Sequence, residues 1–306
     1  MSNYAKQTMI QKVQQAEIAR PLFSILLPTW NNLPYLKLCV KSIQKNAHFN
    51  HQIIVIINEG TDGTLDWVKS QNTLDYVYST DNIGICFGLN AARSLAKADY
   101  ICYFNDDMYA CPNWDVPLKS EIDNIPHNHF FLSATMIEPT DTNNPCVIVA
   151  DYGRDLATFK EGQLLKVYDS LPIKDWQGAT WPPNVVHIDI WDLVGGYSIE
   201  FSPGMYSDPD FSMKLWVAGV RYFKGIAASK VYHFGSKSTG KIRHNNGKKT
   251  FLLKWRQSSH DFTTNTLKRG KTVESQLNDS TASKIHINKT SSGYQKLKMI
   301  WNILFR

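Results

Sequence analysis

The fold of this chain is constrained above all by a regular alternation of apolar runs with helical patterns over residues 23–104. The runs 23–27 and 53–57 consist almost entirely of β-branched and other apolar residues, which is typical of strands that a parallel sheet buries on both faces. Helical patterns separate these runs from each other and from later strand patterns at 76–79 and 100–104. The order predicts an α/β fold with a mostly parallel, doubly wound sheet and helices on both of its faces.

The first of these helices is predicted from its apolar residues, which recur three and four positions apart and therefore fall on one helix face. Asn31 or Asn32 can cap its start, and Pro34 suits its first turn. Two more helices are expected at 64–71 and 84–97. The apolar positions of the first helix are Leu36, Cys39, Val40 and Ile43.

Beyond residue 109 the alternation weakens, and no internal repeat is present. Segments 236–249 and 265–292 are polar with few large apolar groups, so they are expected to be linkers. The remaining expected strands are 130–137, 186–190, 221–226 and 230–234, and the remaining expected helices are 191–195 and 210–218.

Length and composition are those of an ordinary globular protein with one large or two smaller domains. The chain has 306 residues, of which 43% are hydrophobic and 20% charged. No apolar run approaches the roughly 18–20 residues that cross a bilayer, and residues 1–20 contain no signal-peptide block. Five cysteines without a CxxC pair argue against disulfides and against a cysteine zinc site. We therefore expect a cytoplasmic protein with reduced, buried cysteines.

The net charge of +6 is unevenly distributed along the chain. Residues 1–236 carry 18 Lys and Arg against 24 Asp and Glu, a net charge of −6, whereas residues 237–306 carry 15 against 3, a net charge of +12. The last seventy residues are therefore predicted to be a separate basic extension. Such an excess of positive charge suggests an anionic partner, for example a membrane surface. A solvated basic face is the alternative.

Polar residues follow each of the first four predicted strands. Ligands of doubly wound sheets bind outside the carboxyl ends of the strands, so these polar segments are expected to form the ligand site. None of them carries a Walker motif or the GxGxxG motif, which argues against a P-loop NTPase and a standard dinucleotide-binding enzyme. The segments are 28–32, 58–64, 80–84 and 105–107.

Asp106 and Asp107 are the strongest chemical signal within these segments. Adjacent carboxylates repel each other unless a cation lies beside them. Mg²⁺ and Mn²⁺ prefer oxygen ligands and usually complete their coordination with substrate phosphates. The pair therefore suggests a divalent metal site, although a solvated turn after a strand would have the same composition.

Seven motifs follow one another in a fixed order between residues 22 and 234. They are SILLPTWN at 24–31, NEGTDGT at 58–64, Asn82-x-Gly84 with Asn90, NDD at 105–107, GGY at 195–197, SDPD at 207–210 and Tyr232-His233. In this order they resemble the family 2 glycosyltransferases of the GT-A fold, which transfer sugars from nucleotide diphosphates. The resemblance implies a mixed sheet and a catalytic domain 22–236, with a nucleotide-binding half 22–109 and an acceptor half 110–236. An N-terminal segment 1–21 and the basic, partly helical extension 237–306 lie outside the resemblance.

The resemblance also implies an inverting, metal-dependent enzyme and assigns roles to single residues. Asn105 and Asp107 lie at the ends of a motif that is Asp-x-Asp in the family, so Asp107 is expected to bind Mn²⁺ or Mg²⁺. His233 matches a position that often supplies a further metal ligand. Asp208 matches the catalytic base, although Ser207 replaces the Glu that usually precedes it. The changes at 105 and 207 leave open a catalytically impaired, GT-A-like carbohydrate- or nucleotide-binding protein.

A nucleotide sugar is the expected donor. Pro28 and the neighbouring residues of the first strand end are expected to contact the nucleotide. Asn58 or Glu59 can accept a hydrogen bond from the base N3–H, which favours UDP- or dTDP-sugars over GDP-sugars. The resemblance also assigns Asn82, Gly84 and Asn90 to the segment that packs beside the nucleotide. Gly84 is expected to permit a close approach of its backbone to the nucleotide.

The acceptor is expected to be a hydroxyl of a glycan or of a lipid-linked sugar in cell-surface polysaccharide synthesis. Trp176, Trp181 and Trp191 precede Asp208 in the sequence, and exposed aromatic rings stack on sugars, although tryptophans are as often part of a core. A sugar-nucleotide pyrophosphorylase is the competing enzyme class, but it would open with a Gly-rich loop that the chain lacks. No nucleic-acid-binding motif accompanies the basic residues, so we expect no nucleic-acid partner.

The end of the chain, residues 294–306, has the pattern of an amphipathic helix. Such a helix is too short to cross a bilayer, but it suits peripheral attachment to anionic lipid at the inner face of the membrane. Docking on the catalytic domain, or on a second copy in a homo-oligomer, is the alternative. The apolar face would consist of Leu297, Ile300, Trp301 and Leu304.

Overall fold

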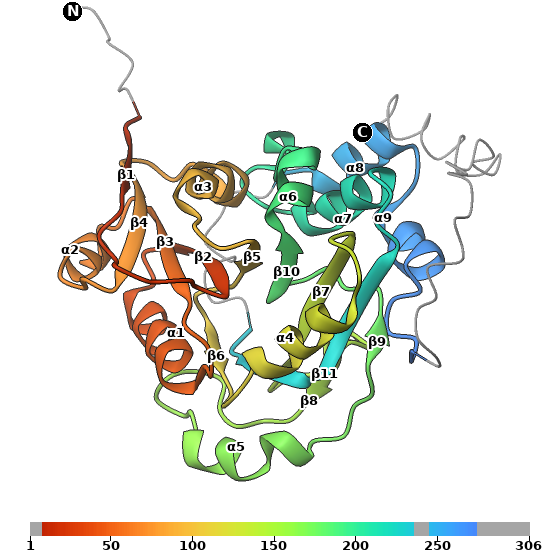
Figure 1. Cartoon of the computed structure of the whole chain (residues 1–306), viewed down its shortest axis with the longest axis horizontal. Helices are drawn as coiled ribbons and strands as arrows, with labels where there is room; N and C mark the ends of the chain where they lie inside the picture. The colour runs from red at the N-terminus through yellow and green to blue at the C-terminus, as the bar shows by residue number, and fades with distance from the viewer. Residues whose placement is uncertain (1–7, 236–244, 274–306) are drawn as a thin grey trace, which may run out of the picture.

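The structure is a computed structural model, and it describes residues 8–235 and 245–273 (Figure 1). The strands are β1 (Ile10–Val13), β2 (Phe23–Trp30), β3 (Gln52–Asn58), β4 (Leu74–Ser79), β5 (Tyr100–Tyr103), β6 (Met108–Ala110), β7 (Phe130–Glu138), β8 (Val147–Val149), β9 (Trp176–Gln177), β10 (Asn184–His187) and β11 (Tyr222–His233). The α-helices are α1 (Leu33–Asn46), α2 (Thr64–Lys69), α3 (Gly84–Ala92), α4 (Asp115–Asn124), α5 (Glu161–Val167), α6 (Ile188–Val194), α7 (Ser207–Val217), α8 (Gly247–Trp255) and α9 (Ser259–Asp261). Shorter helical segments are η1 (Arg93–Leu95), η2 (Tyr168–Ser170), η3 (Ile199–Phe201) and η5 (Phe262–Thr266).

The described strands form one mixed sheet in the order β1-β4-β3-β2-β5-β10-β7-β11-β6, with β8 beside β7 and β9 beside β11. Strands β4, β3, β2 and β5 are parallel, as the sequence predicts for the first half. Strand β10 enters antiparallel between β5 and β7, and β11 runs parallel to β7. The predicted α/β fold with a doubly wound mixed sheet is therefore confirmed.

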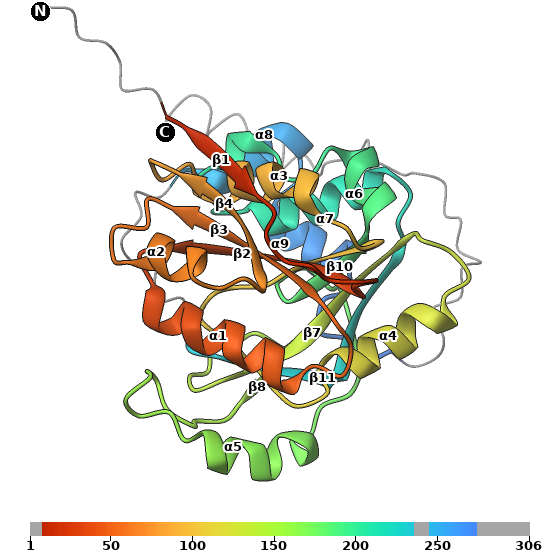
Figure 2. The ribbon, with the colours of Figure 1, turned by 60° about the vertical axis from the view of Figure 1, so that its left-hand side comes forward.

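The central strands are buried on both faces because their successive residues point into two different cores. In β3, Ile53, Val55 and Ile57 pack in one core with α1, α2 and α4, whereas Ile54 and Ile56 pack in another core with α3, α6 and α7. Figure 2 shows α1 and α4 on one side of the sheet and α3, α6 and α7 on the other. The continuous apolar runs of the sequence thus follow from burial between two helix layers.

Helix α1 buries the four apolar residues that predict it, and it begins after Asn32, one of the two expected caps. The Asn32 side chain, however, makes no capping hydrogen bond. Instead the backbone N–H of Leu33 donates to Asp62 Oδ2 at 2.8 Å. Asp62 also accepts hydrogen bonds from Thr64, so one carboxylate ties together the starts of α1 and α2.

The sequence prediction did not contain β1, β6, β8, β9, α4, α5, α8 or α9. Three differences from the prediction have a clear structural cause. Strand β1 was not predicted; it pairs antiparallel with β4 at the edge of the sheet, and its mostly exposed residues carry no apolar alternation. The strand predicted at 186–190 ends at His187, because the His187 side chain accepts a hydrogen bond from the N–H of Asp189 and so starts α6. The two strands predicted at 221–226 and 230–234 are one strand, β11, with an irregularity between Ile226 and Lys230.

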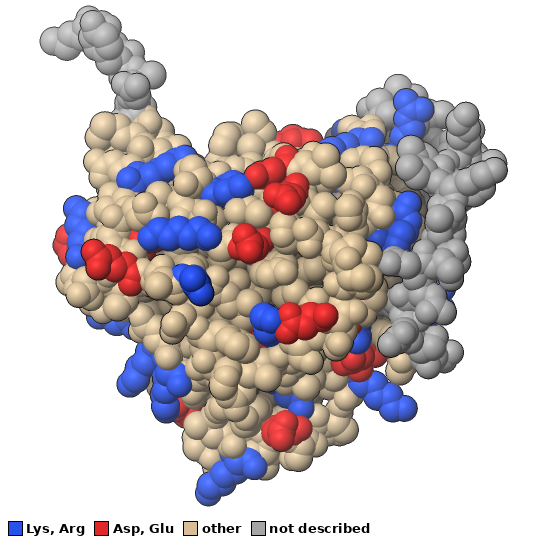
Figure 3. All heavy atoms as spheres, viewed as in Figure 1, with Lys and Arg blue, Asp and Glu red and all other residues tan. Residues whose placement is uncertain are grey.

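The described part of the basic extension, residues 245–273, packs against the rest of the chain. Phe251, Phe262 and Leu267 are buried in the core that contains α3, α6 and α7. This part of the extension therefore belongs to the same packed unit as the rest of the described chain, although the net charge changes sign at residue 236. On the face shown in Figure 3, Lys and Arg are interspersed with Asp and Glu. Residues 294–306, with their expected amphipathic helix, lie outside the described residues.

Two further expectations can be compared with the described residues. All five cysteines are buried and free, as predicted. Across 8–235 and 245–273, no helix is long and apolar enough to cross a membrane.

The Asp210→Ala variant tests how firmly the extension is attached. Asp210 is fully buried in α7, accepts a hydrogen bond from Trp255 Nε1 at 2.7 Å and pairs with Lys254 Nζ at 2.9 Å. Its removal leaves a buried donor unpaired, so the free energy of unfolding in urea should fall by about 1–3 kcal/mol. Asp123→Ala, which removes an exposed pair with Lys119, should cost less than about 1 kcal/mol. Equal losses would contradict this assignment.

Candidate active site

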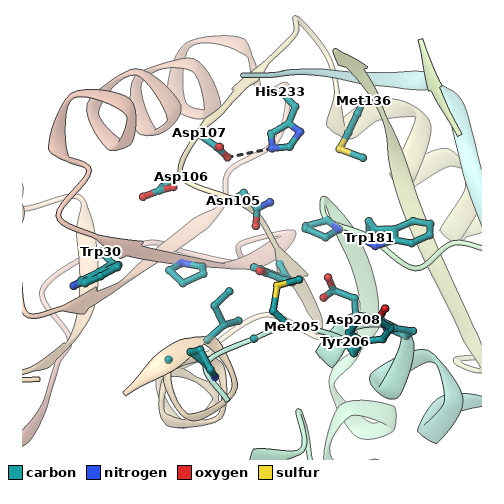
Figure 4. Close-up of a pocket in the computed structure, with 18 of the residues that line it drawn as sticks. Trp30, Asn105, Asp106, Asp107, Met136, Trp181, Met205, Tyr206, Asp208 and His233 are labelled. Atoms are coloured by element: carbon teal, nitrogen blue, oxygen red, sulfur yellow. Dashed lines mark ion pairs between the residues drawn. The ribbon is translucent and has the colours of Figure 1, made fainter. Parts of the chain in front are cut away.

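A pocket of about 670 Å³ opens at the carboxyl ends of β2 and β5 (Figure 4). After β2 the chain continues to β3 and β4 on one side, and then returns to place β5 on the other side of β2. A doubly wound sheet leaves a crevice at such a reversal of strand order, and ligands bind there. All four polar segments predicted from the strand ends contribute to its wall. Their contributions are Pro28, Thr29, Trp30, Asn58, Asn82, Gly84, Asn105, Asp106 and Asp107.

Asp106 and Asp107 are both buried, but they face different partners. Thr29 Oγ1 donates a hydrogen bond to Asp106 Oδ2 at 2.6 Å, which fixes Asp106 against the end of β2. Burial and the charge of Asp107 raise the pKa of Asp106 to about 7, while the hydrogen bond from Thr29 opposes this shift. Figure 4 shows Asp107 directed toward His233 and Asp106 directed away from it. Of the two carboxylates, Asp107 is thus the one that faces a histidine.

The register of β6 and β11 brings His233 to Asp107, because Met108, the residue after Asp107, pairs with His233. His233 Nε2 lies 3.3 Å from Asp107 Oδ1, and His233 Nδ1 lies 2.7 Å from Glu138 Oε1. Burial alone would lower the pKa of His233, but Asp107 and Glu138 outweigh burial and raise it to about 10. The site therefore favours a positive charge between these carboxylates.

The same residues can be tested as ligands of a divalent metal. Within the described ranges, no group of three or more His, Cys, Asp or Glu side chains is arranged to hold a metal. Asp107 Oδ1 and His233 Nε2 do face each other, and Nε2 is buried without a hydrogen bond. Two such ligands fit a cation that takes its remaining ligands from water and substrate phosphates.

Asp208 lies in the first turn of α7 and lines the pocket, where Figure 4 shows its carboxylate directed inward. The Tyr197 hydroxyl donates to Asp208 Oδ1 at 3.3 Å. Burial raises the pKa of Asp208 to about 7, and the hydrogen bond from Tyr197 opposes the shift. Asp208 does not cap the helix, since the N-cap position is Tyr206. Its neighbour Asp210 faces α8 and does not reach the pocket.

Several residues expected at the nucleotide have other contacts. Asn58 Oδ1 accepts from the N–H of Ile83, and Glu59 accepts from Trp30 Nε1 at 2.9 Å without lining the pocket itself. Asn90 lies away from the pocket, where it binds both backbone groups of Tyr197. Asn90 therefore supports the partner of Asp208 and not the nucleotide directly.

Gly84 permits a close backbone approach, as expected, but the approach is to the protein itself. Its φ is +75°, and a Cβ atom at this position would lie 2.7 Å from the Cα of Pro203. The contact joins the start of α3 to the loop before α7. Gly84 thus helps to position Asp208 relative to the ends of the parallel strands.

Only one of the three candidate tryptophans lines the pocket. Trp181 does so, whereas Trp176 and Trp191 are buried in the core. Glu138, the last residue of β7, also lines the pocket, but it belongs to no motif and so could not be predicted from the sequence. The same holds for the part of the wall that comes from the basic extension, because this part lies beyond the motifs. That part consists of Ser259, His260, Thr263 and Arg269.

Solved structures identify the fold. GalNAc-T7 in complex with UDP, GalNAc and Mn²⁺ is similar with a TM-score of 0.55 and 16% identity, covering 81% of this chain and 50% of that chain. The mannosyltransferase PcManGT from Pyrobaculum calidifontis, in complex with GDP-Man and Mn²⁺, is similar with a TM-score of 0.51 and 16% identity, covering 85% of this chain and 68% of that one. The chain has the GT-A fold of these glycosyltransferases.

Sequence comparisons identify the family. Residues 24–168 match the model described as Glycosyl transferase family 2, and over these residues the chain belongs to that family. The glycosyltransferase TuaG of Bacillus subtilis (strain 168), named for teichuronic acid biosynthesis, is 27% identical over 92 residues, 29% of this chain and 36% of that protein. The glycosyl transferase WcaA of Escherichia coli (strain K12), named for colanic acid biosynthesis, is 29% identical over 101 residues, 30% and 35% of the two. The matches span about a third of these relatives.

Proposed function

We propose that the chain is an inverting glycosyltransferase that moves a sugar from a nucleotide diphosphate, preferably UDP or dTDP, to a hydroxyl group of an acceptor. The observation that carries the proposal is the position of Asp208 in one pocket with Asp107 and His233. This arrangement offers a proton acceptor for the attacking hydroxyl and, across the pocket, ligands for a phosphate-bound cation. The family match over residues 24–168 supports the same reading.

Asp208 is the proposed general base. In this role its carboxylate takes the proton of the acceptor hydroxyl as that oxygen attacks the anomeric carbon from the face opposite the leaving diphosphate. Tyr197 holds Asp208 Oδ1 by a hydrogen bond, and Asn90 in turn holds Tyr197 by two backbone hydrogen bonds. This chain of contacts would keep the carboxylate in one orientation toward the pocket.

Asp107 and His233 are the proposed ligands of Mn²⁺ or Mg²⁺. A bound divalent cation would stabilise negative charge on the departing diphosphate. Glu138 holds the His233 ring through Nδ1, which leaves Nε2 facing Asp107, where the two side chains would hold the cation. Thr29 and Asp106 would brace the strand end from which Asp107 projects.

The acceptor class and the cellular setting are part of the proposal. TuaG and WcaA are named for the biosynthesis of teichuronic acid and colanic acid, and we propose a glycan or lipid-linked sugar in cell-surface polysaccharide synthesis as the acceptor. Attachment to an anionic membrane surface on its cytoplasmic side, or assembly of a homo-oligomer, would depend on residues 294–306.

A donor panel tests the proposed function. Purified protein is incubated with Mn²⁺ and UDP-, dTDP- or GDP-sugars, and the release of nucleoside diphosphate is followed with and without a mixture of glycan acceptors. We expect release from a uridine or thymidine donor that increases with acceptor. No release from any donor, combined with tight nucleotide binding, would instead favour the catalytically impaired binding protein.

The activity should also depend on pH through Asp208. A base must be deprotonated to act, and the pKa of Asp208 is raised to about 7, so kcat/KM should rise with pH, reach half of its maximum near pH 7 and level off above it. Tyr197→Phe removes the hydrogen bond that lowers this pKa and should move the midpoint to higher pH. A profile that stays flat between about pH 5 and pH 8 would argue against Asp208 as the base.

A further inference from the structure

Arg269 is held in the pocket wall by a fixed backbone. The N–H of Arg269 donates to Thr263 O at 2.9 Å, and the next residue donates to Gln177 O at 3.0 Å. Gly178, with φ +82°, packs closely against the Arg269 backbone, since a Cβ at residue 178 would be 2.7 Å from the Cα of Arg269. A bridge between Trp176 and Thr272 continues the contact with β9. The guanidinium therefore projects from an anchored segment.

The Arg269 side chain lies over the ring of Trp181, with its Cζ 5.0 Å from the ring centroid, and both residues line the pocket. Among the described residues, Arg269 has no ion-pair partner. It is also the one Arg or Lys among the described residues that line the pocket. The rest of the wall carries four carboxylates and two histidines, of which His233 pairs with Asp107 and Glu138. The carboxylates are Asp106, Asp107, Glu138 and Asp208.

The position of this pair indicates which ligand it faces. Figure 4 shows Trp30 at one end of the pocket and Trp181 at the other, with Asn105 and Asp208 between them. The nucleotide is expected at the strand end that carries Trp30, because this is the switch point of the sheet. Because Arg269 lies over Trp181, it belongs to the opposite end of the pocket, on the side of the proposed base, where the acceptor is expected.

We propose that Trp181 and Arg269 form an acceptor subsite that selects an acidic saccharide. Trp181 offers a face for a sugar ring, and the guanidinium of Arg269 offers paired donors for a carboxylate or phosphate on that sugar. Without Arg269, the carboxylates of the wall would repel such an acceptor. The inference rests on the proposed transferase function, since it names the acceptor class of the same pocket.

Matched neutral and acidic sugars test the subsite. With UDP and Mn²⁺ present, ligand-observed NMR titrations compare methyl β-glucuronide with methyl β-glucoside, and N-acetylglucosamine 6-phosphate with N-acetylglucosamine. The acidic member of at least one pair should bind about tenfold more tightly, and the pair that shows the preference distinguishes carboxylate from phosphate. Arg269→Met should abolish the preference, and Arg269→Lys should retain part of it. Trp181→Ala should weaken both members of the pair.

Two controls separate this inference from others. Lys271→Met removes a neighbouring exposed cation that does not line the pocket, and it should leave the preference unchanged. UDP should bind wild type and Arg269→Met equally.

A loss of UDP affinity in Arg269→Met would assign Arg269 to the donor diphosphate and overturn the proposal. Normal UDP binding without any acidic preference, including no binding of any of the four sugars, would also overturn it but leave the transferase function standing. Failure of wild type to bind UDP would instead count against the proposed function.

Discussion

Asp208→Asn should lower the rate of sugar transfer by about 10²–10⁴-fold, the usual contribution of a general base. The amide has the size of the carboxylate and can still accept the hydrogen bond from Tyr197, but it cannot take up the proton of the acceptor hydroxyl. UDP affinity should stay close to that of wild type, because the substitution does not touch the strand ends that face the nucleotide. The measurement combines initial rates of UDP release in the presence of acceptor with calorimetric titration of UDP.

Asp189→Asn is the matched control, since it changes an exposed carboxylate on the neighbouring helix α6. Its transfer rate should equal that of wild type. A rate of more than about a third of wild type in Asp208→Asn would refute the assignment of the base. Asp210 is a poor substitute for this role, because both of its oxygens contact Lys254 or Trp255 away from the pocket.

Asp107→Ala should abolish the dependence of nucleotide binding on Mn²⁺. In wild type the cation and the diphosphate complete each other's coordination, so UDP should bind more tightly with Mn²⁺ than with EDTA. Loss of a group that merely supports a metal ligand costs roughly 10–100-fold in metal affinity, so loss of the ligand itself should cost at least about 100-fold. Calorimetric titrations of UDP into both proteins, with Mn²⁺ and with EDTA, measure the difference.

Asp123→Asn, an exposed change on α4, is the control and should keep the full effect of Mn²⁺. His233→Ala should weaken the effect, because His233 Nε2 faces Asp107. Equal UDP affinity with Mn²⁺ and with EDTA in wild type would contradict a role for the metal in the proposed mechanism. An unchanged effect of Mn²⁺ in Asp107→Ala would place the cation on other ligands.

The first half of the fold could be predicted because its signal is local. Strands β2 and β3 are buried on both faces and so are apolar at nearly every position. In α1, all four apolar residues that predict the helix are buried. Strand β1 has exposed residues and depends on the edge of β4, so its own sequence carries no signal. The end of β10 was also missed, because its last residue, His187, caps the helix that follows.

The residues of the candidate site that belong to motifs could be predicted from the sequence. Asp107, His233 and Asp208 belong to motifs and share one pocket. Glu138 and Arg269 reach the same pocket through pairing and packing over long sequence separations, which no local pattern records. For the same reason Asn90, expected at the nucleotide, contacts Tyr197 instead.

The anomeric configuration of the product tests the central claim most directly. With an α-linked donor from the active part of the panel and water as the acceptor, ¹H NMR identifies the anomer of the sugar that is released first, before mutarotation. A single displacement assisted by Asp208 predicts that the β anomer appears first and that Asp208→Asn suppresses its release. Release of the α anomer first would mean retention and would contradict the proposed mechanism.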